Sequence, residues 1–215
     1  MWVAAIVAGA MLFLRRRGDA GIWGAGWHWP VPDLLLGDVR YPAVVSQELH
    51  PGHAGVDIMY RRRSPADRSG DYPAGAVGPD GGRSGTTMFF APPGTPILAA
   101  REARVWSVQT LPTGIAVVLD HGAPWATFYG HLATCSLEPA QGGHRSDGGA
   151  PETVSAGQGI GTMGYNPNTN PARGAVDGER VRHLHFEAWY KGGNSAASQD
   201  PERVMAGWER ATWRL

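Results

Sequence analysis

Short apolar runs alternate with turn-forming residues through the middle of the chain. The runs at 94–110, 114–122 and 125–134 are rich in β-branched and aromatic residues, and glycine or proline separates them. This rhythm is typical of strands joined by tight turns, and no long stretch here has the periodicity of an amphipathic helix. The pattern predicts a mainly β, antiparallel single domain over 46–215, closed by one short helix within 198–210.

Polar, glycine-rich segments interrupt this domain at about 61–87, 138–153 and 165–181. Runs of turn-forming residues of this length predict surface loops, and loops this long usually carry function. We expect them to line a groove. The 31 glycines and 17 prolines of the chain fit a fold with many turns.

The N-terminal part has a different composition. An apolar run of 13 residues is followed directly by three arginines, and residues 1–17 form this segment. The run is shorter than the roughly 20 residues of a full membrane span, and a secretory signal would carry its charges before the run. A short membrane anchor, a signal whose true start lies elsewhere and a packing helix all stay open, and membrane association is favoured.

Residues 18–45 are rich in glycine, tryptophan and proline, without helical periodicity. We expect a linker or arm whose tryptophans dock onto the edge of the domain. An aromatic platform for sugar or peptide is the alternative.

Charge and cysteine content narrow the function classes. The 19 basic and 19 acidic side chains balance, so no electrostatic argument favours nucleic acid as a partner. The single cysteine, Cys135, cannot form an internal disulfide. No glycine loop opens a helix beside it, so we expect a bystander thiol rather than a nucleophile.

Histidines carry the candidate chemistry. The strand-like segment "RHLHFEAWY" places His183 and His185 on one face, because side chains two apart in a strand point the same way. Upstream lie His53 and Asp57, in "HPGHAGVDIMY", and His131, in "TFYGHL". Zinc takes imidazole nitrogen and carboxylate oxygen, and a catalytic zinc keeps three protein ligands. A lone histidine is usually a surface residue or a hydrogen-bonded core residue. Together, however, these histidines and Asp57 predict a metal site, with two histidines that are not needed as ligands.

Six segments in this order resemble zinc metallopeptidases of the lysostaphin/LytM type: "HAGVDI", "GTPILAA", "VVLDHG", "TFYGHL", "VSAGQGIGTMG" and "HLHFEAW". The resemblance covers about residues 50–204. It implies one zinc ion held by His53, Asp57 and His185, with His131 and His183 as the two catalytic histidines.

The resemblance also implies an activity. We expect a zinc-dependent endopeptidase that hydrolyses peptide bonds in peptidoglycan stem peptides or cross-bridges, in cell-wall remodelling or phage-type lysis. Base and oxyanion roles would fall to His131 and His183, in an order that the sequence leaves open. His121, in "LDHG", is interpreted as structural. The loops at 61–87 and 165–181 are longer than the family pattern, which leaves the bond that is cut undefined.

Other interpretations stay open. The chain could be a zinc-stabilised module that binds peptidoglycan or activates another hydrolase without cutting, although the complete set of histidines favours the enzyme. A cytosolic peptidase with another substrate fits the apolar N-terminus less well. The expected location is the cell envelope, membrane-associated or exported, or the cell wall after delivery by a phage. The oligomeric state stays open.

Overall fold

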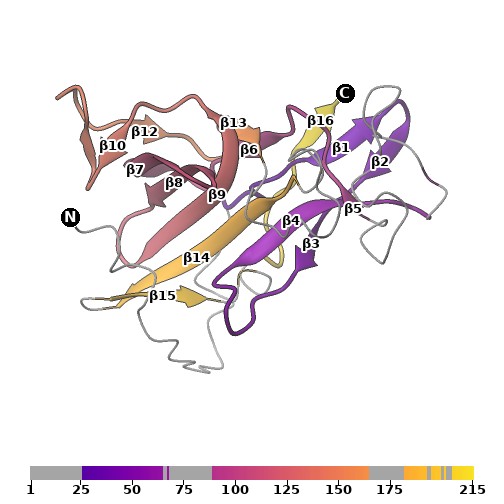
Figure 1. Ribbon diagram of the computed structural model, residues 1–215, viewed down its shortest axis with the longest axis horizontal. Helices are drawn as coiled ribbons and strands as arrows, with labels where there is room; N and C mark the ends of the chain where they lie inside the picture. Colours follow the sequence, from indigo (N-terminus) through magenta and orange to yellow (C-terminus); the bar gives the residue numbers. More distant parts are fainter. Residues whose placement is uncertain are drawn as a thin grey trace.

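Short β-strands dominate the computed structural model, which describes residues 26–64, 67, 89–164, 182–192, 195–199, 201 and 205–215 (Figure 1). In chain order they are β1 (Asp33–Leu36), β2 (Val39–Tyr41), β3 (Ala43–Gln47), β4 (Val56–Arg61), β5 (Phe89–Phe90), β6 (Pro96–Leu98), β7 (Ala103–Leu111), β8 (Gly114–Asp120), β9 (Trp125–Cys135), β10 (Ala140–Gln141), β11 (His144–Arg145), β12 (Thr153–Val154), β13 (Gly159–Met163), β14 (Leu184–Gly192), β15 (Ser195–Gln199) and β16 (Thr212–Arg214). The predicted mainly β, antiparallel fold is confirmed.

The larger sheet has the strand order β11, β10, β7, β8, β9, β14, β4 and β3, and each of these neighbouring pairs is antiparallel. β14 runs through its middle, between β9 and β4 (Figure 1). Strands from the start, the middle and the end of the domain therefore lie side by side, and this brings distant residues to one place.

β14 shows how the sheet separates core from site. Leu184, Phe186 and Ala188 are buried, whereas His185 and Glu187 alternate with them and are half-buried. Because successive side chains of a strand point to opposite faces, one face of β14 packs on the core and the other carries polar groups.

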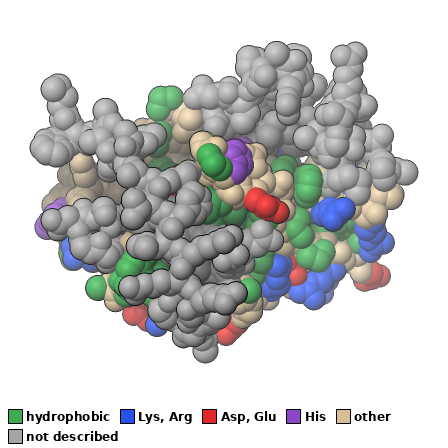
Figure 2. All heavy atoms as spheres, turned by 90° about the horizontal axis from the view of Figure 1, so that it is seen from below, with side chains coloured by type: hydrophobic (Ala, Val, Ile, Leu, Met, Phe, Trp, Pro, Cys, Tyr) green, Lys and Arg blue, Asp and Glu red, His purple; other side chains and the backbone are tan. Residues whose placement is uncertain are grey.

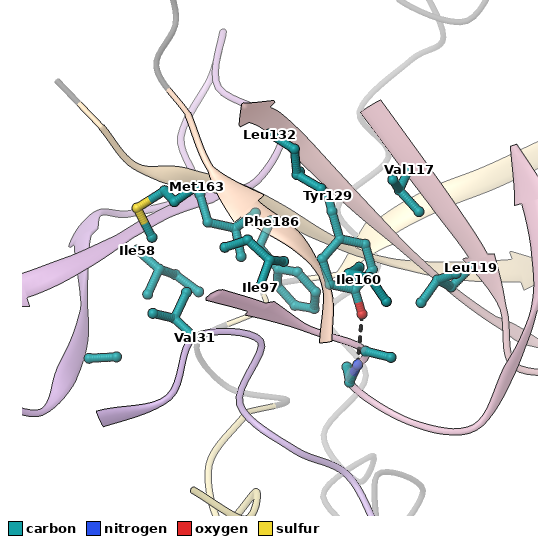
Figure 3. Packing of buried hydrophobic residues seen from close by; sticks show 14 of the residues in the cluster. Val31, Ile58, Ile97, Val117, Leu119, Tyr129, Leu132, Ile160, Met163 and Phe186 are labelled. Atoms are coloured by element: carbon teal, nitrogen blue, oxygen red, sulfur yellow. Dashed lines mark hydrogen bonds between the residues drawn. The ribbon is translucent and has the colours of Figure 1, made fainter. Parts of the chain in front are cut away.

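The core packs behind this sheet (Figure 3). Ile58, Ile97, Tyr129, Ile160 and Phe186 are fully buried and come from five strands. The backbone N–H of Ala100 donates to the hydroxyl of Tyr129 at 2.8 Å, which satisfies the one polar atom of that side chain. The core thereby buries an aromatic ring without leaving its hydroxyl unpaired.

Residues 26–45 lie in the segment predicted as a linker or arm whose tryptophans dock onto the domain, and several of them are part of the core. Trp27 is 1% exposed and its ring stacks on Trp208 at 4.9 Å between centroids. Val31 and Leu34 are fully buried. Glycine and proline form the turns between short strands in this segment. Trp27 is buried rather than part of an exposed aromatic platform, because burial of its large apolar ring is favourable.

Strand β1 belongs to a small second sheet, between β2 and β16. It pairs with β16 in parallel, which ties the start of the described chain to its end. The buried carboxylate of Asp33 holds this junction: it accepts hydrogen bonds from Arg40 Nε at 2.9 Å, Arg210 Nη1 at 2.8 Å and the Ala43 N–H at 3.1 Å. A buried charge is tolerated because it is paired in this way.

The predicted loop at 138–153 contains a hairpin. Gln141 pairs with His144, and between them Gly142 and Gly143 have φ values of 61° and 79°. Two successive residues in the left-handed region make the type I′ turn that suits the twist of a hairpin. Within the segment predicted as a C-terminal helix, the Met205 N–H donates to the Pro201 carbonyl at 2.8 Å, and residues 202–204 lie outside the described residues.

Several predicted segments fall outside the described residues: the apolar N-terminal segment 1–17, most of the loop at 61–87 and the loop at 165–181. Within the described residues, no helix has the length and apolar character needed to cross a membrane. On the face seen in Figure 2, histidine and acidic side chains lie near the centre among hydrophobic ones, and Lys and Arg side chains gather to one side.

Cys135 ends β9, half-buried against the core, and burial raises the pKa of its thiol. We therefore expect slow alkylation by iodoacetamide at neutral pH, and no loss in Cys135→Ser of the hydrolytic activity that the sequence resemblance implies. Mass spectrometry of the alkylated protein and a rate assay measure both. Fast labelling together with loss of activity in the serine variant would make Cys135 functional.

Candidate metal centre

His53 is positioned by a tight turn just before β4. The N–H of His53 donates to the carbonyl of His50 at 2.9 Å, and Gly52 has a φ of 92°. Proline followed by glycine, as in Pro51–Gly52, suits the two central positions of a type II turn. The Nδ1 of His53 faces the Glu48 carbonyl at 3.1 Å. A carbonyl only accepts, so Nδ1 carries the hydrogen and Nε2 keeps its lone pair for a metal.

The pairing register of β4 and β14 brings Asp57 next to His185. Asp57 in β4 lies directly opposite His185 in β14, and Gly130 of β9 lies opposite His185 on the other side. Directly opposed side chains of an antiparallel pair are near neighbours on one face. The carboxylate and the imidazole therefore meet although 128 positions separate them in the chain.

Three donor atoms form a compact triangle. Asp57 Oδ1 lies 3.1 Å from His53 Nε2 and 3.2 Å from His185 Nδ1, and the two nitrogens are 3.2 Å apart. Tetrahedral zinc, with bonds of about 2.0–2.2 Å, sets its ligand atoms about 3.3–3.5 Å apart. The donor types and spacing therefore fit one zinc ion, and these three residues are the ones that the sequence predicted as ligands.

The electrostatics favour binding of a cation. Burial raises the pKa of Asp57, but the hydrogen bond from His185 and the nearby His183 and His53 outweigh it, so the pKa is lowered and Asp57 is a carboxylate at neutral pH. Burial lowers the pKa of His185, whereas its hydrogen bonds to Asp57 and Glu187 raise it, to about 9 overall. In the absence of metal the His185 ring is therefore protonated between two carboxylates, and a bound cation would take the place of the proton on Nδ1, because metal binding releases protons from its ligands.

His131 enters the site from β9 through an unusual backbone conformation. Its φ is 65°, in the left-handed region that residues other than glycine rarely occupy. Its Nδ1 donates to the Thr113 carbonyl at 2.8 Å, which leaves Nε2 as an acceptor. Burial and the neighbouring His183 lower the pKa of His131 to about 4. His131 is therefore a neutral imidazole at neutral pH.

His183 lies close to both His131 and Asp57. The rings of His131 and His183 meet edge to face at 4.9 Å, and His183 Nε2 lies 3.7 Å from Asp57 Oδ2. Gly164 joins the two segments: its N–H donates to the His131 carbonyl and its carbonyl accepts from the His183 N–H. A Cβ at Gly164 would lie 2.4 Å from the His131 oxygen, so this junction requires glycine.

The structure thus brings all five predicted site residues together, the three candidate ligands with His131 and His183 beside them. His121 lies elsewhere, where Nδ1 faces the Glu102 carbonyl at 3.1 Å and Nε2 faces Thr127 Oγ1 at 2.7 Å. These partners fit its interpretation as a structural residue.

Sequence reasoning missed Glu187, which contacts His185 Nε2 at 3.1 Å. The same two-residue spacing that paired His183 with His185 also places Glu187 on that face of β14. That spacing was the signal that could have found it.

Gly55 lets β14 approach the site turn closely. A Cβ there would lie 2.4 Å from the Phe186 carbonyl oxygen, 2.8 Å from Glu187 Cγ and 3.0 Å from His185 Nε2. We expect Gly55→Ala to lower the free energy of unfolding by about 1–3 kcal/mol through overpacking. Denaturant unfolding of the metal-free protein measures it. Gly159→Ala is the matched control, since a Cβ there meets nothing within 4 Å. Equal stability of the two variants would contradict the expectation.

A mostly antiparallel β fold here joins a His–Asp–His triad that could hold a metal ion to two further histidines. The chain belongs to peptidase family M23, whose model matches residues 82–198, slightly more than half of the chain. The matched region holds His131, His183 and His185, whereas His53 and Asp57 lie before it. Their place beside His185 comes from the tertiary structure. A search of curated proteins found no significant match.

Similar folds occur among solved structures. A LytM-type protein from Ruminococcus gnavus, described as a glycyl-glycine endopeptidase, has a TM-score of 0.55 at 20% identity, over 91% of this chain and 66% of that chain. A mutant catalytic domain of the prophage-encoded M23 protein EnpA from Enterococcus faecalis has a TM-score of 0.43 at 19% identity, over 75% and 89%. The catalytic domain of lysostaphin from Staphylococcus simulans has 0.40 at 22% identity, over 63% and 86%. The similarity to the Ruminococcus gnavus protein supports the assigned fold.

Proposed function

We propose that this M23 protein is a zinc-dependent endopeptidase that hydrolyses peptide bonds in the stem peptides or cross-bridges of peptidoglycan. The observation that carries the proposal is the meeting of a zinc-type triad with two histidines that are not needed to hold the ion. A purely structural zinc site is usually closed by four protein ligands, whereas three ligands leave a position for water and substrate.

His53 Nε2, Asp57 Oδ1 and His185 Nδ1 would hold the ion. When bound, zinc supplies Lewis-acid activation of the scissile carbonyl and of the attacking water. The second oxygen of Asp57 lies 3.7 Å from His183 Nε2, so the carboxylate that would hold the ion also lies next to the proposed catalytic imidazole.

We assign the proton-accepting role to His131. A neutral ring with its Nδ1 hydrogen donated to Thr113 offers the Nε2 lone pair to the hydrogen of a water molecule. His183 Nε2 lies 3.7 Å from Asp57 Oδ2, an electrostatic contact rather than a hydrogen bond, and His183 is the second histidine that is not needed to hold the ion. We assign to His183 the donation of a hydrogen bond to the developing oxyanion and of a proton to the leaving amine.

Peptidoglycan as substrate is what the resemblance to lysostaphin/LytM-type peptidases implies, and the Ruminococcus gnavus protein of similar fold carries the name of a glycyl-glycine endopeptidase. A site of this kind would act in the cell envelope, or at the cell wall after delivery by a phage. We propose these locations because the substrate lies there.

Zymography on purified cell walls tests the proposal, with and without a chelator. We expect clearing that a chelator abolishes and added zinc restores. Mass spectrometry of the muropeptides released from walls with different cross-bridges then identifies the bond. Binding to walls without release of fragments would overturn the enzyme in favour of a non-catalytic binding or activating module.

A further inference from the structure

Glu187 continues the polar face of β14 beyond the candidate ligand His185. Its Oε1 lies 3.1 Å from His185 Nε2, on the side of the ring away from the triad. Its side chain is only 13% exposed. The contact is therefore a partly buried, charge-assisted hydrogen bond rather than a solvated surface pair.

This contact decides which nitrogen of His185 faces the ion. A carboxylate only accepts, so Glu187 holds a hydrogen on Nε2. A metal ion would then replace the hydrogen on Nδ1, the nitrogen that faces Asp57, and bind the lone pair left there. Nδ1 is the atom that lies 3.2 Å from Asp57 Oδ1 and 3.2 Å from His53 Nε2. A carboxylate that accepts from a metal-binding imidazole also makes the ring a stronger ligand.

Glu187 is itself held in place by an aromatic neighbour. Trp189 Nε1 donates to Glu187 Oε2 at 2.6 Å, so each oxygen of the carboxylate has its own N–H donor. The Trp189 ring stacks on Phe128 at 5.7 Å with 22° between planes, and Phe128 meets the His185 ring edge to face at 6.0 Å. Gly55 leaves the room that the Glu187 stem occupies.

We propose that Glu187 is a positioning residue of the metal centre, which fixes His185 with Nδ1 toward the ion and is itself fixed by Trp189. The proposal rests on the zinc site of the proposed function, and it assigns Glu187 no contact with substrate.

The first test measures zinc affinity of the full chain by competition with a chromophoric chelator. We expect wild type to bind one zinc ion and Glu187→Ala to bind it about 10–100-fold more weakly, as with other partners of metal-binding histidines. Glu102→Ala, at an exposed glutamate before β7, is the matched control and is expected to keep wild-type affinity.

The second test uses the chemistry of the two donors. In Glu187→Gln the amide has one acceptor oxygen for two N–H groups, and its own NH₂ then faces a donor. Trp189→Phe removes one of those donors. We therefore expect Trp189→Phe to weaken zinc binding in the wild-type background but to tighten it in the Glu187→Gln background.

A spectroscopic readout separates positioning from general stability. The visible absorption of the cobalt-loaded protein reports ligand geometry, and we expect Glu187→Ala to shift it while Glu102→Ala leaves it unchanged. The Glu187→Gln/Trp189→Phe double variant should return the spectrum toward wild type. A residue with a merely structural role would lower the unfolding temperature and leave this spectrum in place.

The outcomes are distinct. Zinc affinity and cobalt spectrum of Glu187→Ala equal to wild type would overturn the role of Glu187 alone. An equal loss caused by Trp189→Phe in both backgrounds would overturn the role of Trp189. A wild-type chain that binds no zinc would overturn the metal site and with it the proposed function.

Discussion

His185→Ala is expected to lose zinc and hydrolytic activity together. The triad has three donor atoms, at 3.1–3.2 Å from one another, and the substitution leaves two. Two protein ligands do not retain a zinc ion against dilution, because protein zinc sites use three or four. Zinc content after desalting should fall from about one ion per chain to background. Atomic absorption on the purified variant and release of muropeptides from cell walls give the two measurements.

His144→Ala is the control for His185→Ala. His144 is an exposed histidine in β11, at the other end of the strand order from β4. It should keep both zinc and activity. A His185→Ala protein that retains a full equivalent of zinc after desalting would remove His185 from the ligand set.

His131→Ala is expected to keep zinc and lose rate. His131 is not one of the three candidate zinc ligands. Its ring enters the site from β9, and its centroid lies 5.8 Å from that of the His185 ring. Loss of a positioned proton acceptor typically costs about 10²–10⁴-fold in kcat. Zinc content and the rate of muropeptide release, measured on the same preparation, separate this result from loss of the metal.

The left-handed backbone at His131 guides the choice of a second variant. Alanine is strained at a φ of 65°, whereas asparagine tolerates this region. His131→Asn should therefore fold at least as well as His131→Ala and be equally slow. Full activity of either variant with zinc bound would sink the assignment of His131 to proton transfer.

The sequence predicted the parts of the site that rest on residue type and short spacing. The two-residue interval between His183 and His185 predicted that they share one face. In the structure His183 lies just before β14 and His185 within it, and both imidazoles lie near Asp57. His53 and Asp57 followed from their chemistry and from the resemblance to lysostaphin/LytM-type peptidases. These features could be predicted because zinc accepts few ligand types, and strand periodicity is local.

Other features could not be derived in this way. Residues 26–45 have the composition of a linker, but Trp27 stacks on Trp208 and Val31 is fully buried. Composition reports which residues turn easily, whereas burial depends on a partner 181 positions away in the chain. The role of His131 likewise depends on one left-handed φ and on the Thr113 carbonyl, and neither is visible in "YGHL".

By itself the sequence determined the β-rich character of this M23 protein, and the resemblance to lysostaphin/LytM-type peptidases predicted the set of residues that would hold zinc. The tertiary structure decided that Asp57 lies opposite His185 and that Nδ1 rather than Nε2 of His185 faces the other donors. It also placed Glu187 against Nε2 of His185 and Trp189 against Glu187. The reason is physical: alternation along a strand is set by neighbouring residues, whereas register between distant strands is set by the packing of the whole sheet.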